Sequence, residues 1–196
     1  PLADLEEKPK NGPSLMPDGL ADPLTRQEFL DLVRFLSELG KGAYAAAPGK
    51  VVRRWQAVLP TKELYTVLNR QRLAAVTADA TLSWGPAYSL VSGDLPLDGL
   101  PAFKPNKDAA TTAVVRFAVE VTTPGKVKLT VNDPAGLTVW ADGAPVDPAA
   151  AMVLDLPAGE RTITVAVDRD KRPTPLRVEL DEVPGSPARA RVLGGK

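Results

Sequence analysis

Two missing residue types limit the chemistry that this chain can perform. Its 196 residues include no histidine and no cysteine. The chain therefore cannot form a Ser-His-Asp triad, a thiolate nucleophile, a zinc site built from Cys and His, or a disulfide. Catalysis would have to use carboxylates, lysine, tyrosine or a carboxylate-bound metal. We expect no catalytic activity from this chain alone.

One group of carboxylates has a spacing found in calcium-binding loops. Asp168 and Asp170 alternate in a predicted loop, and Asp155 could supply a third carboxylate. Lys171 and Arg172 directly follow, and their positive charges would neutralise such a site. A solvated turn is therefore the favoured interpretation.

A second pair of carboxylates, Asp181 and Glu182, could be read as a general acid and base. Neighbouring residues on a strand point to opposite faces of the sheet. The two side chains could not converge on one substrate, so this interpretation is rejected.

Three tryptophans supply aromatic faces that could stack on a sugar ring: Trp55, Trp84 and Trp140. Packing in the core is the alternative for each ring. Trp140 is the best candidate, because the alternation places it opposite Val139, either on the surface or under a loop. Asp142, in an Asp-Gly tight turn, is the second candidate ligand-binding residue.

The best-defined element is a helix predicted from Thr25 to Leu39. A capping box begins it, because the Thr25 hydroxyl can accept from the Glu28 amide while the Glu28 carboxylate accepts from the Thr25 amide. Gly40 predicts its end. Its apolar face must dock on the downstream domain, self-associate or fray. The residues on that face are Phe29, Leu32, Val33, Leu36 and Leu39.

The sequence around this helix, SLMPDGLADPLTRQEFLDLVRFLSELGK, resembles the end of a c-type cytochrome domain, where a Met-Pro loop precedes the closing helix. It is most similar to the haem-binding domain of large multidomain proteins of planctomycetes and their relatives (the PVC group). The resemblance implies that Met16 is an axial ligand of the haem iron in an intact parent, where Met/His ligation raises the iron potential. The Cys-x-x-Cys-His sequence that attaches haem c is missing, so no haem is expected on this chain alone.

From Ala113 onward, apolar and polar residues alternate in short runs that predict strands. Turns rich in Gly, Pro and Asp separate these runs, and no helical pattern interrupts them. An antiparallel sandwich is therefore predicted rather than a parallel α/β sheet. Upstream, the pattern predicts a strand at 51–58, a helix at 61–69, and one or two short strands around 74–78 and 81–83.

The second half of the chain is similar to jelly-roll modules of the galactose-binding-like and PA14-like kind. In these modules a Gly-Leu-x-Val-Trp-x-Asp-Gly hairpin precedes a Leu-x-x-Gly-x-His-x-Ile-x-Val strand pair. Here the first motif spans 136–143 and the second spans 156–165, with Arg161 in place of the His. Together the two resemblances imply a mainly β fold, an antiparallel jelly-roll-like sandwich preceded by a short α-helical remnant of a cytochrome c domain. They do not determine a ligand, since such modules bind sugars, bind proteins or merely space domains.

The chain is accordingly divided into a cytochrome remnant at 1–40, a linker at 41–50, a β-sandwich at 51–188 and an exposed tail at 189–196. Arg189 and Arg191 are expected to be solvated charges in that tail. The formal net charge is zero and the basic residues are scattered, so no nucleic-acid partner is expected. No apolar run reaches the ~18 residues of a membrane span.

Two hypotheses for function follow. In the first, the chain is the C-terminal part of an exported haem-c electron-transfer protein resembling the planctomycete-type membrane-bound dehydrogenases. Upstream haem and dehydrogenase domains of this parent would be its partners, in the periplasm or another extracytoplasmic space, and the sandwich would be a non-catalytic accessory domain. In the second, the chain is a carbohydrate- or protein-binding module with no redox role, and Trp140 and Asp142 lie at its binding site.

Overall fold

The computed structural model describes residues 22–38 and 50–193. The chain divides into two compact units, 1–46 and 47–196, which are described separately. The division lies within the predicted linker at 41–50. In the described residues, no helix is both long enough and apolar enough to cross a membrane.

The first unit contains one described helix, α1 (Arg26–Glu38). The predicted capping box is present: the Thr25 amide donates to Glu28 Oε2 at 2.8 Å, and the Glu28 amide donates to Thr25 Oγ1 at 3.3 Å. The predicted helix is confirmed, although Leu39 and Gly40 lie outside the described residues. Its apolar side chains, Phe29, Leu32, Val33 and Leu36, are 42–56% exposed.

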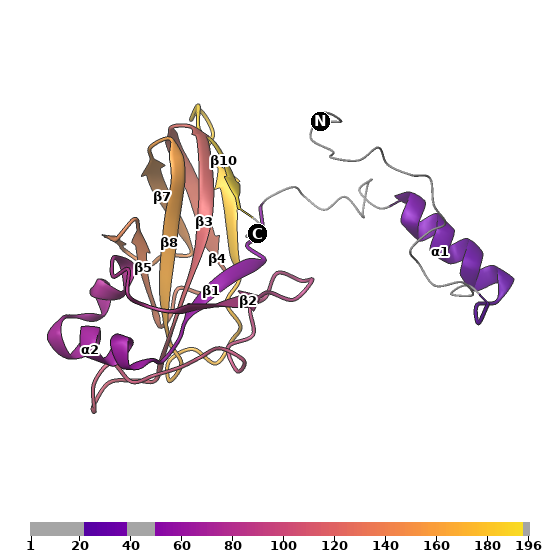
Figure 1. Ribbon diagram of the computed structural model, residues 1–196. Coiled ribbons are helices and arrows are strands. Elements are labelled where there is room, and N and C mark those ends of the chain that lie inside the picture. The colour runs from indigo at the N-terminus through magenta and orange to yellow at the C-terminus, as the bar shows by residue number, and fades with distance from the viewer. Residues whose placement is uncertain (1–21, 39–49, 194–196) are drawn as a thin grey trace, which may run out of the picture. The chain divides into compact units, whose positions relative to one another are not determined.

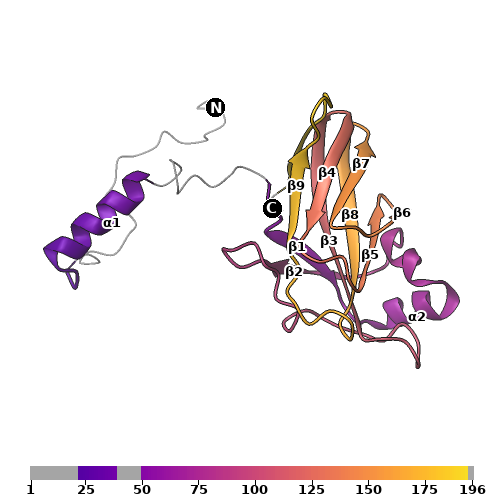
Figure 2. The same cartoon turned by 180° about the vertical axis from the view of Figure 1, so that it is seen from behind.

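The second unit is mainly β and contains two antiparallel sheets, seen from opposite sides in Figures 1 and 2. The large sheet has the order β2-β1-β3-β8-β5-β6, with β10 also paired to β3, and the small sheet has the order β7-β4-β9. The strands are β1 (Arg54–Val58), β2 (Trp84–Tyr88), β3 (Thr112–Thr123), β4 (Gly125–Val131), β5 (Leu137–Ala141), β6 (Ala144–Val146), β7 (Ala151–Leu156), β8 (Gly159–Asp168), β9 (Val178–Glu182) and β10 (Arg189–Val192).

One apolar core joins the facing sides of the two sheets. In β3 the alternating residues Val115, Phe117 and Val119 are buried, and they share a cluster with Leu129 of β4. Trp55 packs edge-on against Phe117, with the ring centroids 5.1 Å apart. The sheets therefore face each other in a sandwich-like arrangement, as the alternation predicted.

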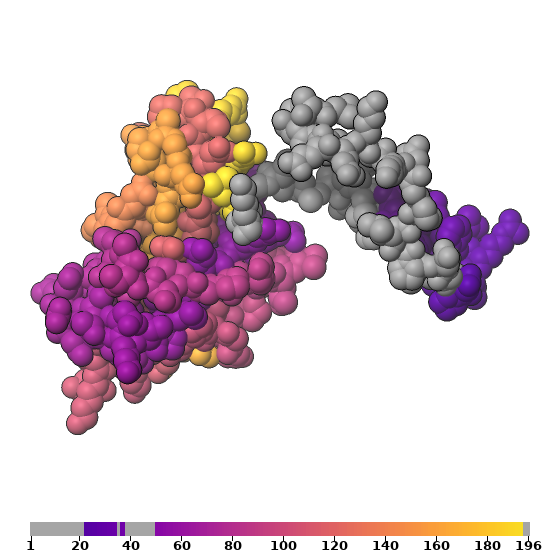
Figure 3. All heavy atoms as spheres, viewed as in Figure 1, coloured from indigo at the N-terminus to yellow at the C-terminus, as the bar shows by residue number. Residues whose placement is uncertain are grey.

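A second, smaller core lies on the outer face of the large sheet. Helix α2 (Lys62–Arg70) contributes Leu64, Val67 and Leu68, and the 3-10 helix η3 (Leu73–Thr77) contributes Val76. These elements cover one end of β3, β5 and β8, as the space-filling view shows (Figure 3). The helix predicted at 61–69 is thus confirmed.

The strands predicted at 74–78 and 81–83 are wrong. Residues 73–77 form η3 because burying Val76 against the large sheet takes the place of strand pairing. At 81–83 the Asp79 carboxylate accepts from the Thr81 amide at 2.8 Å and from its hydroxyl at 2.6 Å, which makes a turn. The strand begins only afterwards, at Trp84.

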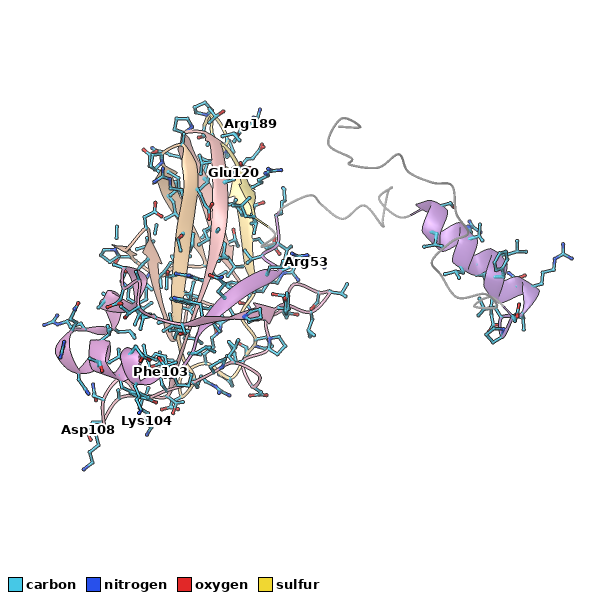
Figure 4. The ribbon with its side chains drawn as sticks, in the orientation of Figure 1. Arg53, Phe103, Lys104, Asp108, Glu120 and Arg189 are labelled. Carbon is cyan, nitrogen blue, oxygen red and sulfur yellow. The ribbon has the colours of Figure 1, made fainter. Side chains whose placement is uncertain are left out.

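The predicted tail at 189–196 is also wrong over residues 189–192, which form β10. β3 is 12 residues long. On the edge that it shares with β1, Val115 and Arg116 pair with β1 and Thr112 pairs with Phe103, so the far end of that edge is open to another strand. Arg189 and Arg191 are not isolated charges, because they form ion pairs with Glu182 at 2.9 Å and Glu120 at 2.5 Å. Figure 4 shows Glu120 and Arg189 toward the same end of β3 and β10.

Candidate functional site

Side chains from several strands form a row across the outer face of the large sheet. Residues opposite one another in antiparallel strands project from the same face. The strand registers place five residues in line, in the order Pro86 (β2), Gln56 (β1), Arg116 (β3), Thr164 (β8) and Trp140 (β5). This face is turned away from the core between the sheets, so the part of the row not covered by α2 and η3 faces solvent.

Arg116 is the residue of this row best suited to bind a ligand. Its Nε donates to Gln56 Oε1 at 2.8 Å, and its Cζ lies 3.9 Å from the centroid of the Trp84 ring. The hydrogen bond and the cation–π contact fix the plane of the guanidinium. The side chain is therefore held in one orientation before any ligand binds.

Within residues 22–38 and 50–193, no carboxylate forms an ion pair with Arg116. Its two terminal nitrogens make none of the hydrogen bonds found in this part of the chain. Burial lowers the pKa of the Arg116 guanidinium from its ordinary value, and no nearby anion offsets that cost. A partly desolvated cation with unused donors, arranged in a fork, is suited to a carboxylate or a similar planar anion.

The edge strand β2 places an exposed aromatic side chain on the same face of the sheet as Arg116. Trp84, Pro86 and Tyr88 alternate along β2 on the outer face. Tyr88 is 62% exposed, whereas Trp84 is half-buried beneath Arg116. Tyr88 is therefore the ring of this strand with an open face for stacking.

The structure places the three tryptophans in three environments. Trp140 is 5% exposed and packs in the outer core under α2, so the predicted parity is correct and the ring lies under other elements. Trp55 is buried between the sheets, and its Nε1 donates to Ser89 Oγ at 2.9 Å. Neither ring has a free face for a sugar. One face of Trp84 is occupied by the guanidinium of Arg116.

Asp142 acts within the β5–β6 turn. Its backbone has a positive φ of 47°, its Oδ1 accepts from the Thr162 amide at 2.8 Å, and its amide donates to the Thr162 carbonyl at 2.8 Å. Arg161, which replaces the His of the resembled motif, donates to Asp142 Oδ2 at 3.4 Å. These bonds attach the turn to β8, so the role of Asp142 in this structure is to stabilise the fold.

The three aspartates considered for calcium do not come together. Asp155 lies on β7 just before the turn into β8, whereas Asp168 ends β8, nine residues after the strand begins. Asp168 accepts from the amides of Asp170 at 3.0 Å and Lys171 at 3.2 Å, and Asp170 accepts from the Thr111 amide at 3.3 Å. In the described part of the chain, no three acidic side chains gather in a way that could hold a metal ion.

The Asp181–Glu182 pair is likewise divided between separate partners. Asp181 pairs with Lys50 at 3.3 Å and Lys128 at 3.5 Å, while Glu182 pairs with Arg189. No shared site forms between the two carboxylates, as the strand geometry predicted.

Arg172 is a structural residue that the sequence did not reveal. It was expected to neutralise nearby aspartates, but it is 1% exposed and donates to backbone carbonyls of Asp133 and Pro175 and, at 2.6 Å, to Asn132 Oδ1. Burial lowers its pKa, and the Asp133 charge partly offsets this effect. The Lys-Arg-Pro sequence around it is typical of a solvated turn, so no pattern in the sequence indicated that Arg172 is buried.

Met16 lies outside the described residues. The donors that the chain does contain do not fit haem c, because a single thioether, without a histidine ligand or cysteine attachment, cannot hold the group.

Comparison with protein family models, with curated proteins and with solved structures found no match for this chain. The sequence alone did not single out Arg116, because it is only one polar residue of an alternating strand. Its partners Gln56 and Trp84 lie 60 and 32 residues earlier in the chain.

Proposed function

We propose that the second unit is a non-catalytic, jelly-roll-like accessory module that binds a carboxylate-bearing polysaccharide on the outer face of its large sheet. The observation that carries this proposal is Arg116, whose guanidinium is held by Gln56 and Trp84 with its terminal donors unused. A fixed guanidinium fork matches the carboxylate of a uronic acid in bidentate geometry.

The surroundings of Arg116 favour a polysaccharide over a small molecule. The site is a row on an open sheet instead of an enclosed cavity, so it can accept a long chain passing across the strands. Gln56 offers an amide for sugar hydroxyls, and the 62% exposed Tyr88 offers an aromatic face of the kind that pyranose rings contact.

The jelly-roll assignment has support from the order in which the chain visits the sheets. From β3 onward, the chain passes from the large sheet to the small one at β4, returns at β5, and continues to cross at β7, β8, β9 and β10. Repeated crossing between two sheets is typical of double-sheet jelly rolls.

Binding of the full chain to polygalacturonate, measured by isothermal titration calorimetry with neutral dextran as the comparison, tests the proposed function. We expect binding to polygalacturonate only, weakened at least tenfold by Arg116→Gln and partly retained by Arg116→Lys. Arg189→Gln is the matched control, since it removes one positive charge from a different edge of the sheet and should leave affinity within about twofold.

Three results would contradict the proposal: no binding to polygalacturonate, equal binding to dextran, or unchanged binding by a folded Arg116→Gln variant. Binding to acidic peptides without binding to polygalacturonate would also contradict it, because the site would then serve a protein partner. Far-UV circular dichroism and thermal melting of each variant separate loss of the site from loss of the fold.

A second proposal concerns the parent protein. We propose that the chain is the C-terminal part of an exported haem-c electron-transfer protein, with Met16 as an axial ligand completed by upstream domains. The supporting observation is α1, whose capping box and amphipathic pattern match the closing helix that the resemblance implies. The accessory role of the second unit is compatible with both proposals.

A further inference from the structure

Three edges of the two sheets are protected against pairing with another strand. β6 has only three residues and includes Pro145, while β10 has four and includes a register shift at Arg189. At β9 the edge is covered by residues 50–52, which lie just before β1: the Val52 amide donates to the Val178 carbonyl at 3.0 Å, and the Leu180 amide donates to the Lys50 carbonyl at 2.6 Å. Shortness, proline, irregularity and coverage are the usual ways in which proteins block edges.

The edge strand β2 is protected by its proline. The Leu59 amide donates to the Ser83 carbonyl and the Ser89 amide to the Arg53 carbonyl, so every second residue of β2 pairs with β1. Pro86 is one of the residues between, so its position without an N–H faces the open edge.

β7 has none of these protections. It is six residues long, it contains no proline, and its register with β4 continues without a shift from Leu156 to Ala151. The Val131 amide donates to the Ala150 carbonyl opposite it, so the even-numbered residues of β7 pair with β4. The amides and carbonyls of Ala151, Val153 and Asp155 consequently face outward.

No other strand of residues 50–193 pairs with this outward edge, and no described segment runs beside it in Figure 1 or Figure 2. On the outer face of the same strand, Val153 is 58% exposed, the largest apolar side chain of β7 that is not in the core. This open edge presents the backbone amides and carbonyls of three residues, with the exposed Val153 at its centre. Such an edge is a template for the addition of another strand.

The sequence of β7 is complementary to itself in the antiparallel direction. If a twofold axis passes beside Val153, that residue faces its own copy, and Ala151 faces Asp155 of the second chain. In this register, each β7 residue whose amide and carbonyl point to the open edge lies opposite another such residue of the second chain. On the inner side Met152 faces Leu154 of the second chain, so apolar residues meet, and no two like charges are opposite each other.

We propose that two copies of this chain pair through their β7 strands in this register, joining the small sheets into one continuous six-stranded sheet. The inference does not depend on the polysaccharide site, which lies on the outer face of the other sheet. Because the contact is one strand wide, the dimer is a weak one.

Sedimentation velocity of the full chain over about 10 µM to 1 mM, the range suited to weak complexes, tests this inference. We expect a concentration-dependent dimer. Val153→Lys and Val153→Glu should each raise the dissociation constant at least tenfold, because each places like charges opposite each other at the axis. An equimolar mixture of the two variants should dimerise again, because opposite charges then face each other.

Val91→Lys is the control, since Val91 is 87% exposed but lies in the loop after β2. It should dimerise like the unmodified chain, as should Arg116→Gln. A monomer over the whole concentration range would overturn the inference. So would dimers that persist in the Val153→Lys variant, or a mixture of the two Val153 variants that stays monomeric.

Discussion

Two arginines of this chain show how one residue type takes two roles according to its surroundings. Arg172 is enclosed by carbonyl oxygens and Asn132, which accept hydrogen bonds from both of its terminal nitrogens within the protein. Arg116 rests on an aromatic ring and one amide, which fix its position but leave donors unused. The first arrangement stabilises a loop, and the second suits the ligand proposed above.

Replacing Arg172 with methionine should lower the free energy of unfolding by about 2–3 kcal/mol, because Asn132 Oδ1 and the surrounding carbonyls lose buried donors. Urea denaturation measures this change. Lys171→Met is the adjacent control, since that side chain is 75% exposed, and its effect should stay within about 0.5 kcal/mol. Equal stability of the two variants would show that Arg172 does not hold the 132–136 turn against the 172–175 loop.

At the scale of elements, α1 depends on its first turn because its apolar face is exposed. The Glu28 carboxylate accepts from both the amide and the hydroxyl of Thr25, each at 2.8 Å. The bond from the Thr25 amide is the main cause that lowers the pKa of Glu28, followed by the bond from the hydroxyl. The carboxylate therefore favours the helix in its ionised form.

The sign of this effect gives a pH dependence. A carboxyl whose pKa is lower in the helix than in the unfolded chain stabilises the helix above its ordinary pKa of about 4.3, and this contribution is lost as the pH falls through the lowered value. NMR chemical shifts of Thr25 and of the α1 backbone in the full chain should therefore move toward coil values in acid. Glu28→Gln keeps an acceptor but does not titrate, so its shifts should lack this step. An identical acid transition in that variant would assign the transition to other groups.

At the scale of the whole molecule, the proposed haem-c parent predicts the behaviour of the chain on its own. The full chain incubated with haem should show no stoichiometric Soret complex, because it contains no histidine and no attachment cysteines. Absorbance titration of the chain and of Met16→Ala measures this. A one-to-one complex that requires Met16 would contradict the prediction, and a parent gene without Cys-x-x-Cys-His upstream would contradict the proposed origin.

The sequence predicted those elements whose pattern is local and strongly periodic. The capping box, the α2 helix and the alternating strands from Val115 onward could all be read from spacing, because side-chain direction repeats every two residues in a strand and every 3.6 in a helix. The η3 segment and β10 could not be. Val76 is buried by packing across a sheet, and Arg189–Val192 becomes a strand only because β3 extends past β1.

The sequence by itself determined the exclusions and the alternation: without histidine or cysteine no chemistry based on them is possible, and period-two runs require sheets with a buried face. Only the tertiary structure decided which polar residues matter. Trp140 moved from candidate ligand residue to core, because α2 and η3 fold over it. Arg116 became the candidate site, because strand register brings Gln56 and Trp84, 60 and 32 residues earlier, against its guanidinium. Such long-range juxtaposition follows from the pairing of distant strands, and no local pattern records it.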